Sequence, residues 1–308
     1  MTRSVFIDGA AGTTGLEIAE RLAGRAEFSL ITLDDARRKD AGARKEALHA
    51  ADFAVLCLHD DAAREAVAMA EGSRVRIIDA STAHRVAPGW TYGFPELVGR
   101  DMVANATRVA NPGCYPTGFL ALVAPLVRAR LLPASWPYTV NAVSGYSGGG
   151  KALIERFEAD PDIAFRDYAL GMGHKHLPEM QALAGLAHAP VFAPAVIAAH
   201  RGMVVEVPLP LAAIPGAAPV AALRAELARF YAGSAVVRLR EGAPDELLLR
   251  QDAAPWDGMD LYVCASADGS QVRLVAHLDN LGKGASGAAV QSLNLMAGLP
   301  ENAGLALS

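Results

Sequence analysis

The stretch SVFIDGAAGTTGLEIAERLAGR, residues 4–25, decides the fold of the first part of the chain. SVFID has the composition of a strand, and TTGLEIAERLAGR that of a helix. Between them Gly9, Gly12 and Gly15 follow the spacing G-x-x-G-x-x-G. Such glycines let a pyrophosphate approach the backbone, with its charge at the helix N-terminus. A tight turn without a ligand is the alternative, but its place in the first strand–helix unit favours a dinucleotide.

The pattern continues over the first 110 residues. Further strands are expected at 28–33, 52–58 and 74–80, and a further helix at 61–72. Strands that alternate with helices predict βαβ units and a Rossmann-type, doubly wound parallel sheet.

After Cys114 the pattern changes. A helix over about 115–130 is followed by many strand-like runs with few helices between them. These runs predict a second, α+β domain with a mixed, mostly antiparallel sheet, and a hinge near 110–114. The expected strands are WPYTVNAVSG, VFAPAVIAA, MVVEVPLP, AVVRLR, ELLLR, DLYVCAS and QVRLVAHL.

Composition and charge argue against several classes of function. The 308 residues carry a net charge of −5, spread along the chain, which gives no indication of a nucleic-acid or membrane-surface partner. No charged-then-apolar leader precedes the first strand, and prolines break the most apolar region, so neither a signal peptide nor a membrane span is expected. Three cysteines without framework spacing favour a reducing cytoplasm.

Cys114 stands in ANPGCYPTGFL, directly after a sharp Pro-Gly turn and at the start of the expected helix. The partial positive charge of a helix N-terminus lowers the pKa of a thiol, and the same N–H groups can stabilise an oxyanion. A small buried residue at a strand–helix junction is the alternative. Cys57 and Cys264 lie within strand-like runs and are expected to be core residues.

A nucleophilic cysteine needs a base or an ion-pair partner. In GMGHKHLPEM, His174 and His176 flank Lys175 in a glycine-bounded loop, and either could act as acid/base or as an anion ligand. An exposed polar loop is the alternative. Cys and His at ligand spacing are missing, so no metal is expected.

Other loops carry polar groups that could bind ligands. SGYSGGGK (144–151) could hold an anion, and IIDASTAHR (77–85) ends a strand where such folds bind ligands. His59, after another strand, could face the cofactor. Asp34 and Asp35 would suit a free ribose hydroxyl, whereas Arg37, Arg38 and Lys39 would suit a 2′-phosphate or form a solvated charge run. The triplet slightly favours NADP.

The set FIDGAAGTTG, IIDASTAHR, GFPEL, ANPGCYPTG, SGYSGGGK, GHKHLPEM and DNLGKGASGAAVQSLNLM resembles the N-acetyl-gamma-glutamyl-phosphate reductases, in their shorter (type 2) form. These motifs span residues 6–296. The resemblance implies a semialdehyde-dehydrogenase-like fold, NADP as cofactor, an acyl phosphate substrate with phosphate as product, a place in arginine biosynthesis and a homodimer or homotetramer. It divides the chain into an NADP-binding domain (1–113), a catalytic and oligomerisation domain (114–279) and a C-terminal helix that returns to the first domain (280–308).

The resemblance makes Cys114 the nucleophile, favours His176 as acid/base and His174 as a substrate contact, and places Asn280 beside the nicotinamide. The longer type has a different arginine-containing motif where STAHR stands, which leaves the task of Arg85 open. Residue patterns and resemblance together assign the cofactor to Gly9, Gly12, Thr13, Thr14, Gly15, Arg37, Arg38, Lys39, His59, Ser81, Asn280 and Gly284, and the substrate to Arg85, Asn111, Ser144, Gly145, Tyr146, Ser147, Lys151 and His174.

Two other functions fit parts of the pattern. An aspartate-semialdehyde dehydrogenase would use the same thioester chemistry on a shorter substrate, although HKHLPEM and GKGASG favour the reductase. A non-catalytic protein that senses NADP would need only the glycine loop and would be expected to lack the cysteine and the histidine pair.

Overall fold

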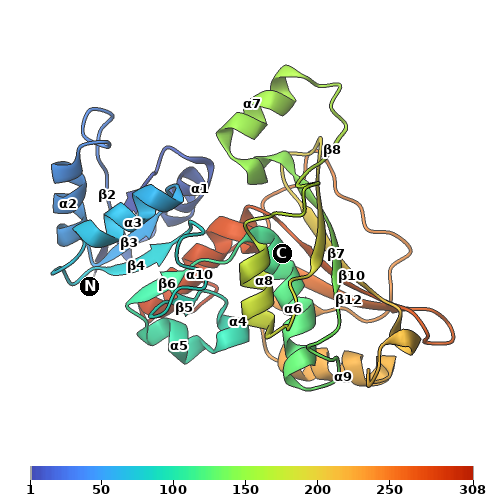
Figure 1. Cartoon of the computed structure of the whole chain (residues 1–308). Coiled ribbons are helices and arrows are strands. Elements are labelled where there is room, and N and C mark those ends of the chain that lie inside the picture. Colours follow the sequence, from blue (N-terminus) through green and yellow to red (C-terminus); the bar gives the residue numbers. More distant parts are fainter. Residues whose placement is uncertain (1, 308) are drawn as a thin grey trace. The chain divides into compact units, whose positions relative to one another are not determined.

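The computed structural model describes residues 2–307, which form two compact units, each built on its own sheet (Figure 1). The first unit contains the residues up to Gly113 together with Ala285–Leu305. The second contains Cys114–Gly284 and the described residues from Ala306 onward. The chain therefore leaves the first unit after Gly113, returns to it at Ala285 and passes back to the second unit from Ala306.

The sheet of the first unit has six parallel strands in the order β2-β1-β3-β4-β6-β5. Parallel neighbours need crossover connections, which the intervening helices supply. The strands are β1 (Arg3–Asp8), β2 (Phe28–Ile31), β3 (Phe53–Leu56), β4 (Arg76–Asp79), β5 (Thr91–Tyr92) and β6 (Arg108–Ala110), and the helices are α1 (Thr13–Leu22), α2 (Ala41–Ala50), α3 (Asp60–Met69), α4 (Pro95–Val98), α5 (Arg100–Asn105) and α10 (Gly287–Met296).

Apolar clusters cover both faces of this sheet. One cluster joins β1 and β3 to α2 and α3 through residues such as Phe6, Leu48 and Val67. The other joins the same strands to α1 and α10, and Val290 and Leu293 of α10 are fully buried in it. The doubly wound parallel sheet expected from the sequence is confirmed, and its core includes a helix from the end of the chain.

The sheet of the second unit has seven strands in the order β11-β12-β13-β10-β7-β9-β8. Its neighbours are antiparallel except in the pairs β11–β12 and β7–β9, so the expected mixed, mostly antiparallel sheet is confirmed. The strands are β7 (Thr139–Gly145), β8 (Phe165–Asp167), β9 (Val191–Ile197), β10 (Met203–Leu209), β11 (Val237–Leu239), β12 (Met259–Ala265) and β13 (Val272–Leu278), the helices are α6 (Cys114–Arg128), α7 (Lys151–Ala159), α8 (Leu177–Ala184) and α9 (Val220–Phe230), and single turns are η1 (Tyr146–Gly149), η2 (Leu211–Ala213) and η3 (Gly282–Ser286).

Helices cover only one face of this second sheet. α6 packs on β10 and β13 and also contacts α8 and α9. Its approach is close, since a Cβ on Gly118 would come within 2.7 Å of the Val205 side chain. The period-two burial of β10 fits a sheet with one covered face. The other face keeps partly exposed side chains.

One expected strand is wrong. ELLLR (246–250) forms no regular secondary structure, although its leucines have strand-like composition. β11 already occupies the free edge of β12, and segment 244–249 instead lines a cavity with side chains from the uncovered face of the sheet. An apolar run shows that side chains pack, but does not decide whether the backbone pairs.

Within the described residues, no helix is long and apolar enough to cross a membrane.

Candidate active site

Cys114 is the first residue of α6, directly after the irregular segment Asn111-Pro112-Gly113. The first N–H groups of a helix have no partner within the helix, and they carry partial positive charge. α6 is 15 residues long and almost wholly buried, so this end is firmly held. The position favours a thiolate.

The other two cysteines have the opposite environment. Burial, with Asp79 and Asp8 nearby, raises the pKa of Cys57 to about 12. Burial also raises the pKa of Cys264, which lies on β12. Both thiols stay protonated at neutral pH, and a protonated thiol is a poor nucleophile.

Both loop histidines lie beside the start of α6. The ring centroid of Tyr115 is 6.1 Å from that of His174 and 5.9 Å from that of His176. The two imidazoles are 4.7 Å apart. His176 is 5% exposed and is the residue before α8, not an exposed loop position. The structure therefore brings the cysteine region and the histidine pair together within one unit.

Hydrogen bonds distinguish the two histidines. The backbone N–H of His176 donates to Nδ1 of His174 at 3.1 Å, so that nitrogen carries no proton. The proton of a neutral His174 is then on Nε2, which lies 3.3 Å from the Tyr168 hydroxyl. Protonation of His174 at Nδ1 would break the first bond. This geometry favours a neutral, positioning His174.

Tyr168 belongs to the same cluster. Burial raises the pKa of its hydroxyl to about 12, and the charge of Cys114 contributes in the same direction. Burial likewise raises the pKa of Tyr115, with Tyr168 and Cys114 as smaller causes. Both phenols therefore remain hydrogen-bond donors at neutral pH. The Tyr115 hydroxyl donates to the carbonyl of Ala195 at 3.0 Å.

The segment that precedes α10 lies against the cysteine. A Cβ on Gly284 would come within 3.0 Å of the Cys114 Cβ. Asn280 is buried, with Nδ2 donating to Ser147 Oγ at 2.8 Å and Oδ1 accepting from the N–H of Gly202 at 2.9 Å. Asn280 and Gly284, both assigned to the cofactor from the sequence, thus belong to the second unit, and Asn280 holds the SGYSGGGK loop through Ser147.

That loop is ordered rather than open. Ser144 and Ser147 are buried, and the N–H of Gly145 donates to the carbonyl of Gly202 at 2.8 Å. The ring of Tyr146 stacks on Phe157 at 5.2 Å. Lys151 is different: it is exposed on α7 and lies 4.0 Å from Glu155 on the same helix.

In the first unit, the glycine loop joins β1 to α1. A Cβ on Gly9 would come within 2.3 Å of the Cys57 carbonyl, and one on Gly15 within 2.5 Å of the Gly9 carbonyl. Gly9 also has φ +89°, where side chains are strained. Gly12 caps α1 without a side-chain hydrogen bond, and Thr13 and Thr14 form its first turn. The loop leaves helix N–H groups for an anion.

The basic triplet beyond β2 is exposed. Arg37 forms an ion pair with Glu46 at 3.1 Å, and Arg38 with Asp35 at 3.0 Å. Exposed pairs of this kind are weak, so a 2′-phosphate could displace these partners. His59 is exposed at the start of α3.

A buried ion pair, not expected from the sequence, lies at the end of β1. Arg44 of α2 donates to Asp8 through Nε and Nη2 at 3.0–3.3 Å. Burial, the largest cause, raises the pKa of Asp8, while hydrogen bonds from Arg44 oppose the shift. The pair ties α2 to the strand that leads into the glycine loop.

The STAHR loop follows β4 and is held by a buried carboxylate. Asp79, with no exposed surface, accepts from Ser81 Oγ at 2.7 Å and lies 2.6 Å from Nδ1 of His84. His84 stacks on Trp90 with centroids 4.1 Å apart. Ser81 thus serves the loop itself, and Asp79 aligns the imidazole next to Arg85.

Arg85 and Asn111 lie together at the carboxyl edge of β4 and β6. Nε of Arg85 donates to the Asn111 carbonyl at 3.0 Å, and Nη2 to the Ala80 carbonyl at 3.3 Å. Asn111 is 1% exposed. Groups of three or more residues suited to hold a metal are absent from residues 2–307.

Family models match both units. A semialdehyde dehydrogenase NAD binding domain matches residues 38–106, and a semialdehyde dehydrogenase dimerisation domain matches residues 114–280. The chain is 50% identical to N-acetyl-gamma-glutamyl-phosphate reductase from Brucella ovis, over 97% of this chain and 100% of that protein. It is 48% identical to the protein of that name from Trichormus variabilis, over 98% of each chain.

The chain belongs to the N-acetyl-gamma-glutamyl-phosphate reductase family.

Solved structures agree with this family at the level of fold. Aspartate semialdehyde dehydrogenase II from Vibrio cholerae superposes with a TM-score of 0.69 over 96% of this chain and 98% of that chain, at 18% identity. The enzyme from Francisella tularensis gives the same TM-score over 96% of this chain and 100% of that chain, at 12% identity. Identities this low support a common fold and nothing about substrate.

For this member of the reductase family, sequence reasoning missed three contacts. Tyr168 and Tyr115 enter the histidine cluster, and His84 is aligned by Asp79. Tyr168 stands six residues before His174 without a motif of its own. Only the proximity of Tyr115 to Cys114 in the sequence could have signalled its role.

Proposed function

We propose that the chain catalyses the NADPH-dependent reduction of N-acetyl-gamma-glutamyl phosphate to N-acetylglutamate 5-semialdehyde and phosphate, through a thioester on Cys114. The single observation that carries this is the cluster of Cys114, His174 and His176 at the start of α6. Similarity to reductases of that name supports the substrate class.

In the first step, the Cys114 thiolate attacks the acyl carbon of the substrate. The carbon–oxygen bond to phosphate breaks, phosphate leaves with the electron pair, and a thioester remains on the sulfur. N–H groups at the start of α6 stabilise the transient oxyanion. The substrate is already activated, so no further energy source is needed.

In the second step, the thioester is reduced to a thiohemiacetal. NADPH, when bound, supplies the hydride to the thioester carbon. The His176 imidazolium protonates the oxygen; the same group then removes that proton as the carbon–sulfur bond breaks. Aldehyde leaves and the Cys114 thiolate is regenerated. Neutral His174, fixed through Nδ1, contacts the substrate.

The first unit fits NADP. Side chains at Gly9 and Gly15 would clash with backbone, so the loop requires glycines, and the helix N-terminus that follows is proposed to meet a pyrophosphate. Arg37, Arg38 and Lys39, all exposed beyond β2, are the groups proposed to meet a 2′-phosphate. Arg85 of the first unit and the buried serines of the SGYSGGGK loop are each proposed to hold a substrate anion.

A phosphate-dependent assay tests this function. The purified protein should reduce NADP with N-acetylglutamate semialdehyde only when phosphate is present. Aspartate semialdehyde serves as the competing substrate, because an aspartate-semialdehyde dehydrogenase would prefer it. Turnover of neither aldehyde, despite tight NADPH binding, would favour a non-catalytic sensor and contradict the proposal. A cytoplasmic location would follow from this biosynthetic role.

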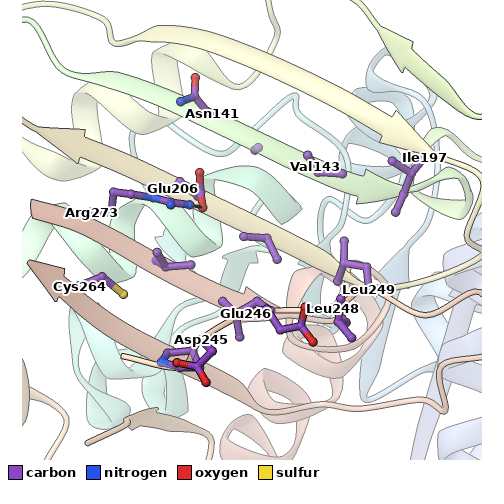
Figure 2. Close-up of a pocket in the computed structure, with 15 residues that line it drawn as sticks. Asn141, Val143, Ile197, Glu206, Asp245, Glu246, Leu248, Leu249, Cys264 and Arg273 are labelled. Carbon is purple, nitrogen blue, oxygen red and sulfur yellow. Dashed lines mark hydrogen bonds and ion pairs between the residues drawn. The ribbon is translucent and has the colours of Figure 1, made fainter. Parts of the chain in front are cut away.

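The uncovered face of the second sheet is the proposed surface for a homodimer, which could pair further into a homotetramer. The family match to a dimerisation domain covers this unit. Val143, Ile197 and Val204 are partly exposed there beside the Glu206–Arg273 ion pair. Segment 244–249 crosses the face and lines an open cavity of about 440 Å³, with Leu248 55% exposed (Figure 2). Such a mixed apolar face is typical of a self-association surface.

Val204→Glu should dissociate the oligomer. A carboxylate buried there without a partner costs several kcal/mol, enough to weaken association by roughly a hundredfold or more. Light scattering after size-exclusion chromatography would measure the mass. Ala228→Glu, at an exposed position on the helix-covered side, is the matched control and should keep the wild-type mass. An unchanged mass for Val204→Glu would exclude this face.

A further inference from the structure

Asn111 has one polar atom without a partner. Its N–H donates to the Asp79 carbonyl at 2.7 Å, and its own carbonyl accepts from Arg85 Nε at 3.0 Å. Nδ2 donates to the Ala285 carbonyl at 3.0 Å. Oδ1 is buried and accepts no hydrogen bond from any described residue. A buried acceptor left in this state is destabilising, because its lost hydrogen bonds to water are not replaced.

The side-chain amide cannot resolve this by turning over. Rotation would place Oδ1 against the Ala285 carbonyl, so that two acceptors would meet and the Nδ2 bond would be lost. The bond to the Ala285 carbonyl therefore fixes Oδ1 as the acceptor end of the amide, while Asp79 and Arg85 hold the backbone of Asn111. A ligand or an ordered water with a donor hydrogen would satisfy it.

The chemistry of the proposed reactants limits which group can donate a hydrogen bond to Asn111 Oδ1. Carboxylate and acyl oxygens are acceptors at neutral pH and cannot donate to Oδ1, whereas inorganic phosphate keeps an O–H but leaves before hydride transfer. Near the reacting carbon, the remaining donors are the carboxamide of nicotinamide, the hydroxyls of its ribose and the acetamido group of the substrate. Of these, only the carboxamide is attached to the ring whose orientation governs hydride transfer. Asn111 belongs to the unit with the glycine loop and follows β6, which is three places from β1 in the sheet. In doubly wound sheets the second half of a dinucleotide lies over that side.

We propose that Asn111 Oδ1 accepts a hydrogen bond from the nicotinamide carboxamide and thereby fixes the orientation of the ring. This inference rests on the proposed function and reassigns Asn111 from substrate to cofactor. Asn111 stands three residues before Cys114 in the sequence.

Two reduced cofactor analogues test the hydrogen bond between the nicotinamide carboxamide and Asn111 Oδ1 separately from the other cofactor contacts. The 3-acetylpyridine analogue of NADPH replaces the carboxamide NH₂ by a methyl group, whereas the thionicotinamide analogue keeps the NH₂. Dissociation constants come from fluorescence or competition titrations, without turnover. The wild-type protein should bind the acetylpyridine analogue about tenfold more weakly than NADPH, the effect of one net hydrogen bond. The thionicotinamide analogue should bind within about threefold of NADPH.

Asn111→Ala should remove this discrimination and bring the acetylpyridine-to-NADPH ratio to about one. Asn111→Asp keeps an acceptor and should keep the ratio near its wild-type value, even if the loss of the Ala285 bond weakens all cofactors. A purely structural role would lower every affinity in Asn111→Ala and leave the ratio unchanged, which would overturn the inference.

Other outcomes are equally decisive. No discrimination in the wild-type protein would overturn the assignment of Asn111 alone. A raised KM for N-acetylated substrate in Asn111→Ala, with the cofactor ratio unchanged, would assign Oδ1 to the acetamido group instead. Failure of the wild-type protein to bind NADPH would contradict the proposed function as well.

Discussion

Cys114→Ser should lower turnover below detection while NADPH binds with wild-type affinity. A serine hydroxyl is protonated at neutral pH and is a far weaker nucleophile than a thiolate, so it cannot form the acyl intermediate. The glycine loop lies in the other unit, so the substitution should leave cofactor binding unchanged. Steady-state rates and NADPH titrations of the same sample would separate the two effects.

Cys264→Ser is the matched control for this variant. Its thiol lies on β12, burial raises its pKa, and it should retain wild-type turnover. Alkylation gives a second readout: iodoacetamide at neutral pH should label Cys114, and acyl phosphate should protect it. Cys57, with a pKa of about 12, should remain unlabelled. Near-native activity in Cys114→Ser would end the thioester mechanism.

His176→Ala should reduce kcat by roughly 10²–10⁴, the usual range for the loss of a general acid/base. The residue is 5% exposed beside Tyr115, and its backbone N–H rather than its ring is tied to His174. We therefore assign proton transfer to its ring, because Nδ1 of His174 already accepts a hydrogen bond. Pre-steady-state measurement should show the thioester forming and its reduction slowed.

His174→Ala is the informative comparison, because it should raise KM more than it lowers kcat. His188→Ala, at an exposed position after α8, should behave as the wild type. If His176→Ala changed only KM while His174→Ala removed kcat, the catalytic role would pass to His174. That result would also require the Nδ1 bond of His174 to break during turnover.

The parallel sheet could be predicted from the sequence because the features that produce it lie close together along the chain. In β1 and α1, strand composition, glycine spacing and helix composition lie within about two dozen neighbouring residues, and short crossovers leave few topologies. ELLLR has equally good strand composition but forms no strand, since strand pairing depends on which sheet edge is free. β8, only three residues long, and α9 gave no signal strong enough to predict.

The residues of the site likewise include some that local sequence predicts and others that depend on tertiary contacts. Cys114 could be predicted from its turn and helix, and the histidine pair from its glycine-bounded loop. The tautomer of His174 depends on Tyr168 and on one backbone N–H, which no spacing rule reveals. The Asp8–Arg44 ion pair and the buried Oδ1 of Asn111, which accepts no hydrogen bond from the described residues, likewise arise from tertiary contacts between distant residues. The surface position of Lys151 could not be foreseen from a glycine-rich motif.

The return of α10 to the first sheet sets the order in which the two units can fold during translation. Val290 and Leu293 complete the core on one face of that sheet, but the ribosome makes them after the whole of 114–284. Until then, a nascent chain carries an apolar sheet surface without its last helix. The inserted unit has all of its own strands earlier, so it is free to fold first, and the nucleotide-binding part closes only at the end of translation.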